Sequence, residues 1–331
     1  MLNHTLKLNS KLWNKDVGKE STRVGFGQGL LKAAIKDDNI VGLCADLTGS
    51  TKMSFFADKF PERFVQVGVA EQNLASVASG MAAMGKIPFI SSFSIFSPGR
   101  NWEQIRTTIC YNDQPVKIAS THSGLTVGPD GGSHQALEDI ALTRVLPNMI
   151  VISPCDALEA EKATIAISKV SKPTYLRLTR DKTPIITTED TPFEIGKANI
   201  VFIPEVGLAS VGVIATGTIL SNVLLAAKLL EKNNNLKIKI LNLSTIKPLD
   251  SEAVIALAKE TKNIVTVEDH QIEGGMGSAV AECLSKNYPT KIKFIGVNNR
   301  FGQSGTASEL LEHYGMDVQS IMRSILETIN N

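Results

Sequence analysis

The stretch from Phe64 to Met84, FVQVGVAEQNLASVASGMAAM, decides the fold, because a short apolar run passes within a few residues into an alanine-rich helical pattern. The join holds one acid, Glu71. An acid in the first turn of a helix complements the helix dipole and needs no ligand. An acid at the carboxyl end of a strand in an open α/β sheet also lies where such folds bind ligands, and apolar neighbours there disfavour its charged form. Both interpretations stay open, and Glu71 is the first candidate for chemistry.

The same alternation of strand and helix patterns continues along the chain. In the first half we expect strands at 40–44, 87–93, 116–120, 149–153 and 174–178, and helices at 27–35, 71–84, 102–110 and 157–169. In the second half we expect strands at 211–216, 237–243, 263–268 and 291–297, and helices at 219–231, 251–259, 277–284 and 318–329. This alternation is typical of βαβ units. It predicts an α/β fold of two consecutive domains, each a mostly parallel sheet flanked by helices.

The predicted domain boundaries rest on one stretch without periodicity. Residues 181–194 are rich in Pro and Thr and are the best candidate for a linker. We divide the chain into an N-terminal arm (1–20), a first domain (21–185), a linker (186–198) and a second domain (199–331). The arm is polar with scattered Leu and Trp, and could dock on a neighbour.

Composition excludes several classes of protein. The chain has 331 residues, 43% of them hydrophobic, and a net charge of +1 without a basic block, which argues against nucleic-acid binding. We find neither a secretory signal nor an apolar span long enough for a membrane, and expect a cytoplasmic protein. The four cysteines lie far apart without a CxxC pair, so we expect buried free thiols rather than disulfides or a zinc site: Cys44, Cys110, Cys155 and Cys283.

The glycine-rich segment 121–135, THSGLTVGPDGGSHQ, carries His122, Asp130 and His134 after an apolar strand. Two histidines in such a loop can transfer protons or bond substrate oxygens near neutral pH. A metal site is a competing interpretation, but Asp130 is the only close third ligand. Either imidazole could also simply bond its own loop.

Three further patterns have both a functional and a structural interpretation. Phe93 and Phe96 could stack on a planar heterocycle or belong to the core. The turn GGMG at 274–277 lacks GxGxxG spacing, so we favour a tight strand-to-helix turn over a phosphate site. Four arginines near predicted strand or helix ends could grip phosphate or lie solvated on the surface: Arg23, Arg100, Arg177 and Arg180.

Taken in order and spacing, these motifs resemble the C-terminal half of transketolase. They are ADLT (45–48), GVAEQN (68–73), SSFSIF (91–96), the loop 121–135 and LTR (178–180), followed by VEDHQIEGGMG (267–277) and RFGQSGT (300–306). The resemblance runs from about residue 22 to the C-terminus. It implies a pyrimidine-binding domain followed by a transketolase C-terminal domain, as in the small subunit of a split transketolase.

The resemblance also implies thiamine diphosphate as cofactor and a role for each candidate residue. Glu71 would bond N1′ of the aminopyrimidine and favour its imino tautomer. The ring pocket would be lined by Phe93, Phe96, Asp46 and Leu47. His122 and His134 would contact the reacting oxygens of the sugar, Asp130 would read hydroxyl configuration, and the sugar phosphate would be clamped by Arg23, Ser50 and Arg180. The catalytic candidates are Glu71, His122 and His134.

Two departures and one absence qualify this resemblance. Gly99 stands where the family has a third aromatic residue, and Pro129 stands where an acid commonly precedes Asp130. The sequence has no GDG motif followed at the family's spacing by Asn, the pattern expected for Mg²⁺ and diphosphate ligands. We therefore assign no metal ligand to this chain, and expect a separate large N-terminal subunit to supply them in an α2β2 assembly.

The implied reaction transfers a two-carbon ketol unit from a ketose phosphate such as xylulose 5-phosphate to an aldose phosphate such as ribose 5-phosphate, through a thiamine-bound carbanion. 1-Deoxyxylulose-5-phosphate synthase and the β subunit of 2-oxo-acid dehydrogenases share the architecture, but GGSHQA (131–136) looks more like transketolase. A non-catalytic assembly or regulatory subunit is the alternative from another class. The presence of every catalytic candidate argues against it.

Overall fold

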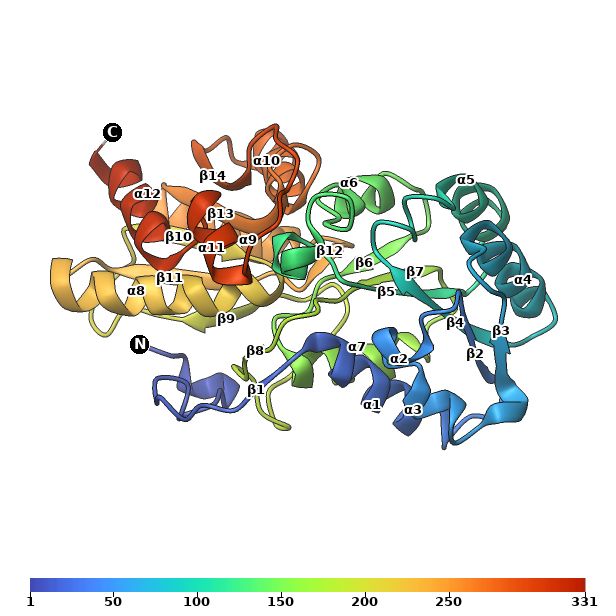
Figure 1. Ribbon diagram of the computed structural model, residues 1–331. Helices are drawn as coiled ribbons and strands as arrows, with labels where there is room; N and C mark the ends of the chain where they lie inside the picture. The colour runs from blue at the N-terminus through green and yellow to red at the C-terminus, as the bar shows by residue number, and fades with distance from the viewer. Residues whose placement is uncertain (331) are drawn as a thin grey trace.

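Two mostly parallel sheets follow each other along the chain, and helices cover both faces of each (Figure 1). The computed structural model describes residues 1–330. The first sheet has seven strands in the order β12-β6-β7-β5-β4-β2-β3. Their bounds are β2 (Ile40–Cys44), β3 (Phe64–Gln66), β4 (Ile87–Phe93), β5 (Lys117–Thr121), β6 (Ile150–Ile152), β7 (Thr174–Arg177) and β12 (Thr245–Lys247). All are parallel except β12, which pairs antiparallel with β6.

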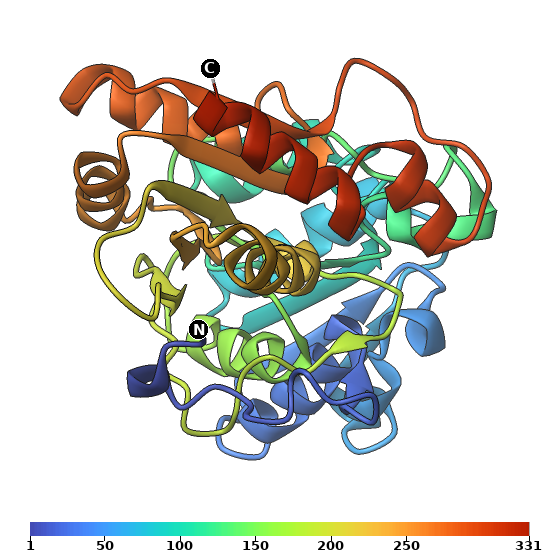
Figure 2. The same cartoon turned by 90° about the vertical axis from the view of Figure 1, so that its left-hand side faces the viewer.

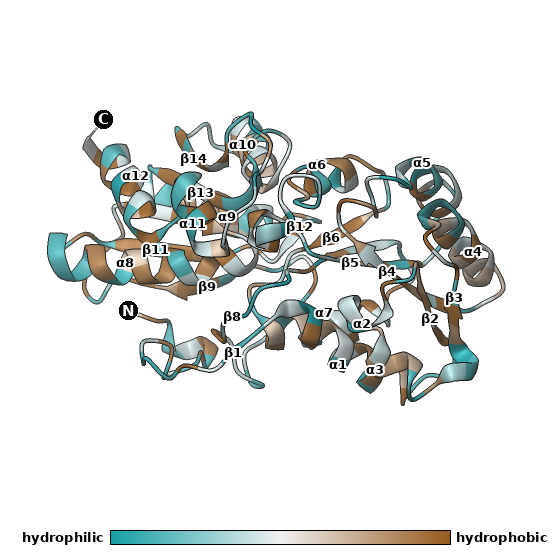
Figure 3. Ribbon diagram, viewed as in Figure 1, coloured by the Kyte–Doolittle hydropathy of each residue, from teal (hydrophilic) through white to brown (hydrophobic). Residues whose placement is uncertain are grey.

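Alternate residues of the strands fill the two faces of the first sheet. Ile40 and Cys44 pack with the helices on one face, whereas Val41 and Leu43 pack on the other, as the period of two along a strand requires. The first face holds α1 (Thr22–Ala34), α3 (Ser54–Ala57) and α7 (Ala157–Ile167); the second holds α4 (Glu71–Ala83), η3 (Ile105–Tyr111) and α6 (Asp139–Arg144). Figure 3 shows apolar residues along the strands between these two layers.

The second sheet has the order β14-β13-β10-β11-β9. Its strands are β9 (Asn199–Phe202), β10 (Val211–Ala215), β11 (Ile238–Asn242), β13 (Ile264–Gln271) and β14 (Ile292–Val297). One face is covered by α8 (Leu220–Asn234) and α12 (Val318–Asn330), the other by α9 (Ser251–Thr261) and α10 (Met276–Asn287). The predicted α/β fold of two consecutive domains is confirmed.

The N-terminal arm lies on the second domain of its own chain (Figure 2). The backbone N–H of Asn3 donates to the carbonyl of Val201 at 3.0 Å, and Leu12 is buried in the core that α8 and α12 share. The neighbour on which this arm docks is therefore the second domain of the same chain, which begins about 180 residues later in the sequence.

The segment between the domains is irregular but firmly held. β8 (Thr183–Pro184) pairs antiparallel with β1 (Lys19–Glu20). The buried carboxylate of Asp156 accepts hydrogen bonds from the backbone N–H groups of Ile186 and Thr187 at 2.7 and 2.6 Å. A buried acceptor satisfied in this way fixes the chain locally. Our numerical boundaries for the domains stay a prediction.

Several details differ from the expected elements. Residues 102–110 form one α-helical turn, α5 (Trp102–Gln104), that continues into the π-helix η3. The remaining short elements are η1 (His4–Leu6), α2 (Thr48–Thr51), η2 (Pro61–Arg63), η4 (Leu125–Asp130), η5 (Gly217–Ile219) and α11 (Ala307–His313). All four cysteines are buried free thiols, as predicted. Over residues 1–330, no helix combines the length and apolar character needed to cross a bilayer.

Candidate active site at the carboxyl edge of the first sheet

The parallel topology of the first sheet places most of the candidate residues at one edge. Strands β2, β3, β4, β5 and β7 run in the same direction, so their carboxyl ends meet. The candidates that end or follow these strands are Asp46 and Leu47 after β2, Glu71 after β3, Phe93 at the end of β4, His122 after β5 and Arg180 after β7. This edge is where open α/β sheets bind ligands.

Glu71 is the first residue of α4, and its side chain is only 1% exposed. Ser92 Oγ donates to its Oε1 at 3.3 Å, and Arg100 Nη1 lies 2.6 Å from its Oε2. The Asn101 amide also donates to the Glu71 carbonyl at 3.0 Å. We expected apolar neighbours around this acid, but a guanidinium faces it instead. The sequence offers Arg100 as a phosphate ligand or as a solvated surface arginine, and neither interpretation places it against Glu71.

Two phenylalanines and two histidines form one aromatic cluster beside Glu71. The rings of Phe93 and Phe96 are stacked with centroids 6.1 Å apart and 17° between their planes. The His122 ring stacks on Phe93 at 3.8 Å, and the His134 ring meets the edge of Phe96 at 5.6 Å. Both phenylalanines keep partial exposure. The cluster therefore offers ring faces to a ligand rather than only filling a core.

His122 is held in one orientation. Its backbone has a positive φ of 61°, its side chain is buried, and Nδ1 lies 2.8 Å from the hydroxyl of Thr121. Burial first, and then the positive charges of Arg23 and Arg180, lower the pKa of His122 to about 3. The imidazole is therefore neutral at physiological pH, with one N–H to donate and one lone pair to accept.

Arg23 and Arg180 line one cavity of about 540 Å³ together with Lys182. Arg23 Nη1 donates to the Ser50 carbonyl at 2.8 Å, and Arg180 Nη1 donates to the Val127 carbonyl at 2.8 Å. Burial and the charge of Arg180 lower the pKa of Arg23. Like charges held beside one cavity favour an anionic ligand. Ser50 contributes to this arrangement through its backbone carbonyl, which accepts the hydrogen bond from Arg23.

Asp46 and Leu47 lie at the end of β2, next to β4, which carries Phe93. The N–H of Asp46 donates to Gln66 Oε1 at 2.6 Å, and the Leu47 carbonyl accepts from the Thr51 hydroxyl at 2.9 Å. Their hydrogen bonds thus run towards β3 and α2. Leu47 packs against the core on the α1 face of the sheet, so what these two residues share with Phe93 is the carboxyl edge of two neighbouring strands.

The loop 121–135 is braced by the second domain. Gln135 Nε2 donates to the Gln303 carbonyl at 3.0 Å, and Asp269 Oδ1 accepts from the Leu125 N–H at 2.9 Å. A Cβ built on Gly132 would lie 2.5 Å from the Gly302 carbonyl oxygen, so the two loops touch backbone to backbone. These bracing residues could not be recognised from the sequence, because each pair joins segments more than 140 residues apart.

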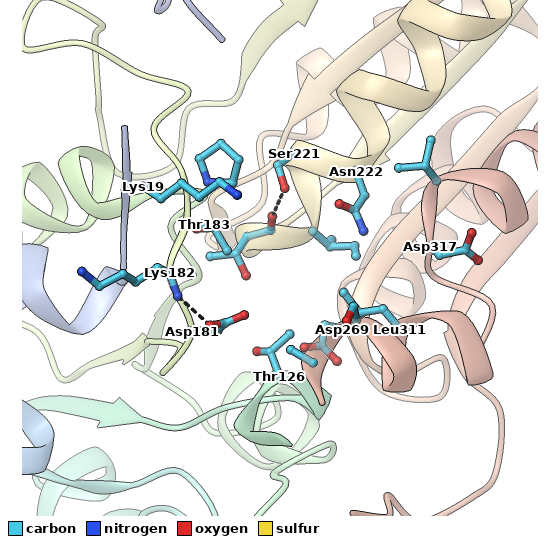
Figure 4. Close-up of a pocket in the computed structure, with 16 residues that line it drawn as sticks. Lys19, Thr126, Asp181, Lys182, Thr183, Ser221, Asn222, Asp269, Leu311 and Asp317 are labelled. Atoms are coloured by element: carbon cyan, nitrogen blue, oxygen red, sulfur yellow. Dashed lines mark hydrogen bonds between the residues drawn. The ribbon is translucent and has the colours of Figure 1, made fainter. Parts of the chain in front are cut away.

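A second cavity of about 350 Å³ adjoins the arginine cavity at the seam between the domains (Figure 4). The two cavities share five lining residues: Thr126, Asp181, Lys182, Ala307 and Ser308. Lys19 and Asn222 lie on opposite sides of it in Figure 4. Three aspartates and two lysines line this second cavity, so the charges at the seam are mixed: Asp181, Asp269, Asp317, Lys19 and Lys182.

Two of the other sequence patterns are structural. The GGMG turn closes on the chain's own acid, because the N–H groups of Met276 and Gly277 donate to the Glu268 carboxylate at 2.6 and 2.8 Å. This outcome agrees with the tight turn that we favoured over a phosphate site. Arg177 is buried against Asp139 at 2.8 Å, so it is not available to a phosphate. Among residues 1–330, no cluster of three or more His, Cys, Asp or Glu side chains could hold a metal ion.

Comparison with known proteins agrees with this architecture. Two family models match, the transketolase pyrimidine-binding domain over residues 19–185 and the transketolase C-terminal domain over residues 207–321. A protein of Methanocaldococcus jannaschii named as a transketolase C-terminal section is 45% identical over 92% of this chain and 95% of its own length. The 6-deoxy-6-sulfo-D-fructose transketolase subunit of a Clostridium species (strain MSTE9) is 38% identical over 90% of this chain and 91% of its own length.

A solved structure gives the same result in three dimensions. It is described as a split-gene transketolase in an inactive β4 tetramer, and it matches this fold with a TM-score of 0.86 at 40% sequence identity. The match covers 94% of this chain and 98% of that one. The chain therefore belongs to the transketolase family, in which it corresponds to the C-terminal section, a pyrimidine-binding domain followed by a C-terminal domain.

Proposed function

We propose that this chain is the C-terminal subunit of a split transketolase that moves a two-carbon ketol unit from a ketose phosphate, such as xylulose 5-phosphate, to an aldose phosphate, such as ribose 5-phosphate. One observation carries the proposal: a buried acid, an aromatic cluster and an arginine pair meet at one edge of the first sheet. Glu71 and the two phenylalanines suit the cofactor ring, the two histidines of the cluster suit the reacting sugar oxygens, and the arginine pair suits the sugar phosphate.

Thiamine diphosphate is the cofactor of this family, and the residues present fit its pyrimidine half. Phe93 and Phe96 offer stacked ring faces beside the buried carboxyl group of Glu71. Asp46 and Leu47 would complete the pocket from the neighbouring strand. When bound, the cofactor supplies the nucleophilic carbon that no protein side chain provides. Glu71 would hold the ring nitrogen N1′ by a hydrogen bond and fix the orientation of the ring.

The sugar would lie between the histidines and the arginines. His122, neutral and fixed by Thr121, and His134 would exchange hydrogen bonds and protons with the reacting oxygens. Asp130 would accept from a sugar hydroxyl and so read its configuration. Arg23 and Arg180, with Ser50 beside them, would bind the phosphate and orient the distant reacting carbons.

An N-terminal subunit would supply the diphosphate half of the site. The missing GDG and Asn pattern supports this division, because Mg²⁺ and phosphate need oxygen ligands. The names of the relatives, a C-terminal section and a transketolase subunit, also support it. We propose an α2β2 assembly in the cytoplasm.

The test is ketol transfer from xylulose 5-phosphate to ribose 5-phosphate, assayed with thiamine diphosphate and Mg²⁺, for this chain alone and mixed with a candidate N-terminal subunit. We expect activity only in the mixture. Activity of this chain alone would refute the shared site. An inactive mixture, with binding between the subunits demonstrated, would refute the proposed reaction.

The role of Glu71 is tested in the same mixture with Glu71→Gln. We expect turnover to fall by a factor of about 100 or more, as for other positioned acid groups. Turnover equal to that of the wild type would instead favour a non-catalytic assembly or regulatory subunit.

The donor sugar is tested against the alternatives within the family. A relative is named for 6-deoxy-6-sulfo-D-fructose, and a cluster of cations could hold a sulfonate as well as a phosphate. Assays with both donors would rank them by kcat/KM. Consumption of pyruvate would instead indicate 1-deoxyxylulose-5-phosphate synthase or the β subunit of a 2-oxo-acid dehydrogenase.

A further inference from the structure

The pocket wall around Phe96 is completed by an arginine where the family has an aromatic side chain. A Cβ built on Gly99 would lie 1.9 Å from the carbonyl oxygen of Ile95, so this backbone leaves no room for a side chain there. The planar group comes from the next residue. The guanidinium carbon of Arg100 lies 4.6 Å from the centroid of the Phe96 ring.

The same guanidinium occupies the accessible side of Glu71. Ser92, fully buried, holds Oε1 from within, whereas Arg100, whose side chain is 49% exposed, holds Oε2 from the solvent side. A ring nitrogen that approaches Glu71 from solvent would meet Arg100 first. The guanidinium is planar, contacts the acid and covers an aromatic face, so it occupies the places that the ring nitrogen and the ring plane of an aminopyrimidine would take.

We propose that Arg100 is a latch on the pyrimidine pocket: it covers Phe96 and pairs with Glu71 until the pyrimidine ring of thiamine diphosphate displaces it. The proposal rests on the proposed function of Glu71. Because Arg100 is half exposed, its guanidinium can return to water when it leaves the pocket. Glu71 has no such route, because it remains buried.

Displacement of Arg100 therefore has a chemical consequence. A buried carboxylate that loses its cation is strongly disfavoured. The free energy needed to break the pair between Arg100 and Glu71 is therefore subtracted from the binding of the pyrimidine ring. Without the guanidinium, the ring would reach Glu71 and Phe96 with no pair to break.

The test is calorimetric titration of thiamine diphosphate into the two-subunit complex with Mg²⁺ near pH 7.5. In Arg100→Met no guanidinium has to be displaced, so we expect an affinity at least about tenfold higher than that of the wild type. Arg100→Lys keeps the cation without the planar group, and its affinity should lie between those of the wild type and Arg100→Met.

Three controls separate the possible outcomes. Arg106→Met changes an exposed arginine on η3 and should not alter the affinity. If Arg100→Met binds the cofactor as tightly as the wild type or more weakly, the latch is refuted. If Glu71→Gln keeps full turnover, the proposed role of Glu71 fails instead. If Arg100→Met does not fold, Arg100→Lys still tests the latch, and an affinity equal to that of the wild type or lower would refute it.

Discussion

Asp130 and Arg180 form an ion pair at the mouth of the arginine cavity, with Oδ1 of the acid 3.6 Å from Nη1 of the arginine. The two side chains are 38% and 39% exposed. Ion pairs this exposed contribute about 0–1 kcal/mol to stability, because water and salt screen them. Loss of this ion pair should therefore leave the fold intact, so a loss of activity confined to phosphorylated substrates reports on the substrate.

Arg180→Gln should weaken use of phosphorylated substrates. Loss of a charge-assisted hydrogen bond worth about 1.5–3 kcal/mol lowers kcat/KM for xylulose 5-phosphate by about 10- to 150-fold. The kcat/KM for unphosphorylated xylulose should stay within about twofold of the wild-type kcat/KM, because this substrate has no phosphate for Arg180 to bind. The measurement is steady-state kinetics of the two-subunit complex. Arg106→Gln is the matched control, and an equal loss with both donors would argue against a phosphate clamp.

Much of the site geometry follows from the sequence through one topological rule. β2 and β4 have the bounds that their apolar runs predict. Once neighbouring strands are known to be parallel, the residues that follow them must share an edge. Glu71 and His122 could therefore be placed together from the sequence, although their contacts could not.

The contacts of Arg100 were not predictable from the sequence. The direction of its side chain depends on the turn that contains Gly99, whose lack of space for a Cβ is a property of the folded backbone. The antiparallel pairing of β12 with β6 and the position of the arm were also missed. Both join segments far apart in the chain, where local propensity carries no information.

Gly302→Ala should disturb the substrate loop from the second domain. The new Cβ would lie 1.7 Å from Gln135 Oε1, and Gln135 is buried and bonded to Gln303, so the loop must move. We expect a loss of about 1–3 kcal/mol in unfolding free energy, measured with urea. The turnover of the complex should fall as well.

The control for this substitution is Gly18→Ala. No atom lies within 4 Å of a Cβ at Gly18. Its unfolding free energy should change by less than about 0.5 kcal/mol. If Gly302→Ala behaved like this control, the second domain would not brace the loop through Gln135.

His122 should make the protein less stable as the pH falls. Its pKa is about 3 in the folded chain, because of burial and the nearby arginines, and near 6.5 in the unfolded chain. The unfolded chain therefore gains a proton below about pH 6.5 that the folded chain does not accept until about pH 3. The stability present above pH 6.5 is lost progressively on acidification, by about 2 kcal/mol at pH 5.

This dependence is measured as a difference. The unfolding free energies of the wild type and of His122→Gln are measured with urea near pH 7.5 and pH 5. The titration of all other groups affects both proteins alike and cancels in the difference between them. The wild type should lose about 2 kcal/mol more than the variant over this interval. A constant difference between the two proteins would show that His122 titrates alike in the folded and unfolded states.

Glu268 should have the opposite dependence. Burial raises the pKa of its carboxyl group from 4.5 to about 7, against the two N–H groups of the GGMG turn. As the pH rises from about 4.5 to 7, the unfolded chain releases a proton that the folded chain retains, so stability falls. Glu268→Gln cannot ionise, and relative to the wild type its unfolding free energy should gain about 2.5 kcal/mol between pH 5 and pH 8.

The comparison between two pH values isolates this ionisation from the change in shape. A glutamine places an NH₂ group against at least one N–H donor of Met276 or Gly277, which costs about the same at both pH values. That constant cost cancels when the stabilities of the variant and the wild type are compared at the two pH values. The sign of the remaining change therefore reports the ionisation of Glu268. A constant difference in unfolding free energy between the two proteins from pH 5 to pH 8 would contradict this prediction, as would a variant that becomes relatively less stable at high pH. Either result would show that Glu268 is an ionised cap at the start of α10 rather than a buried acid that keeps its proton.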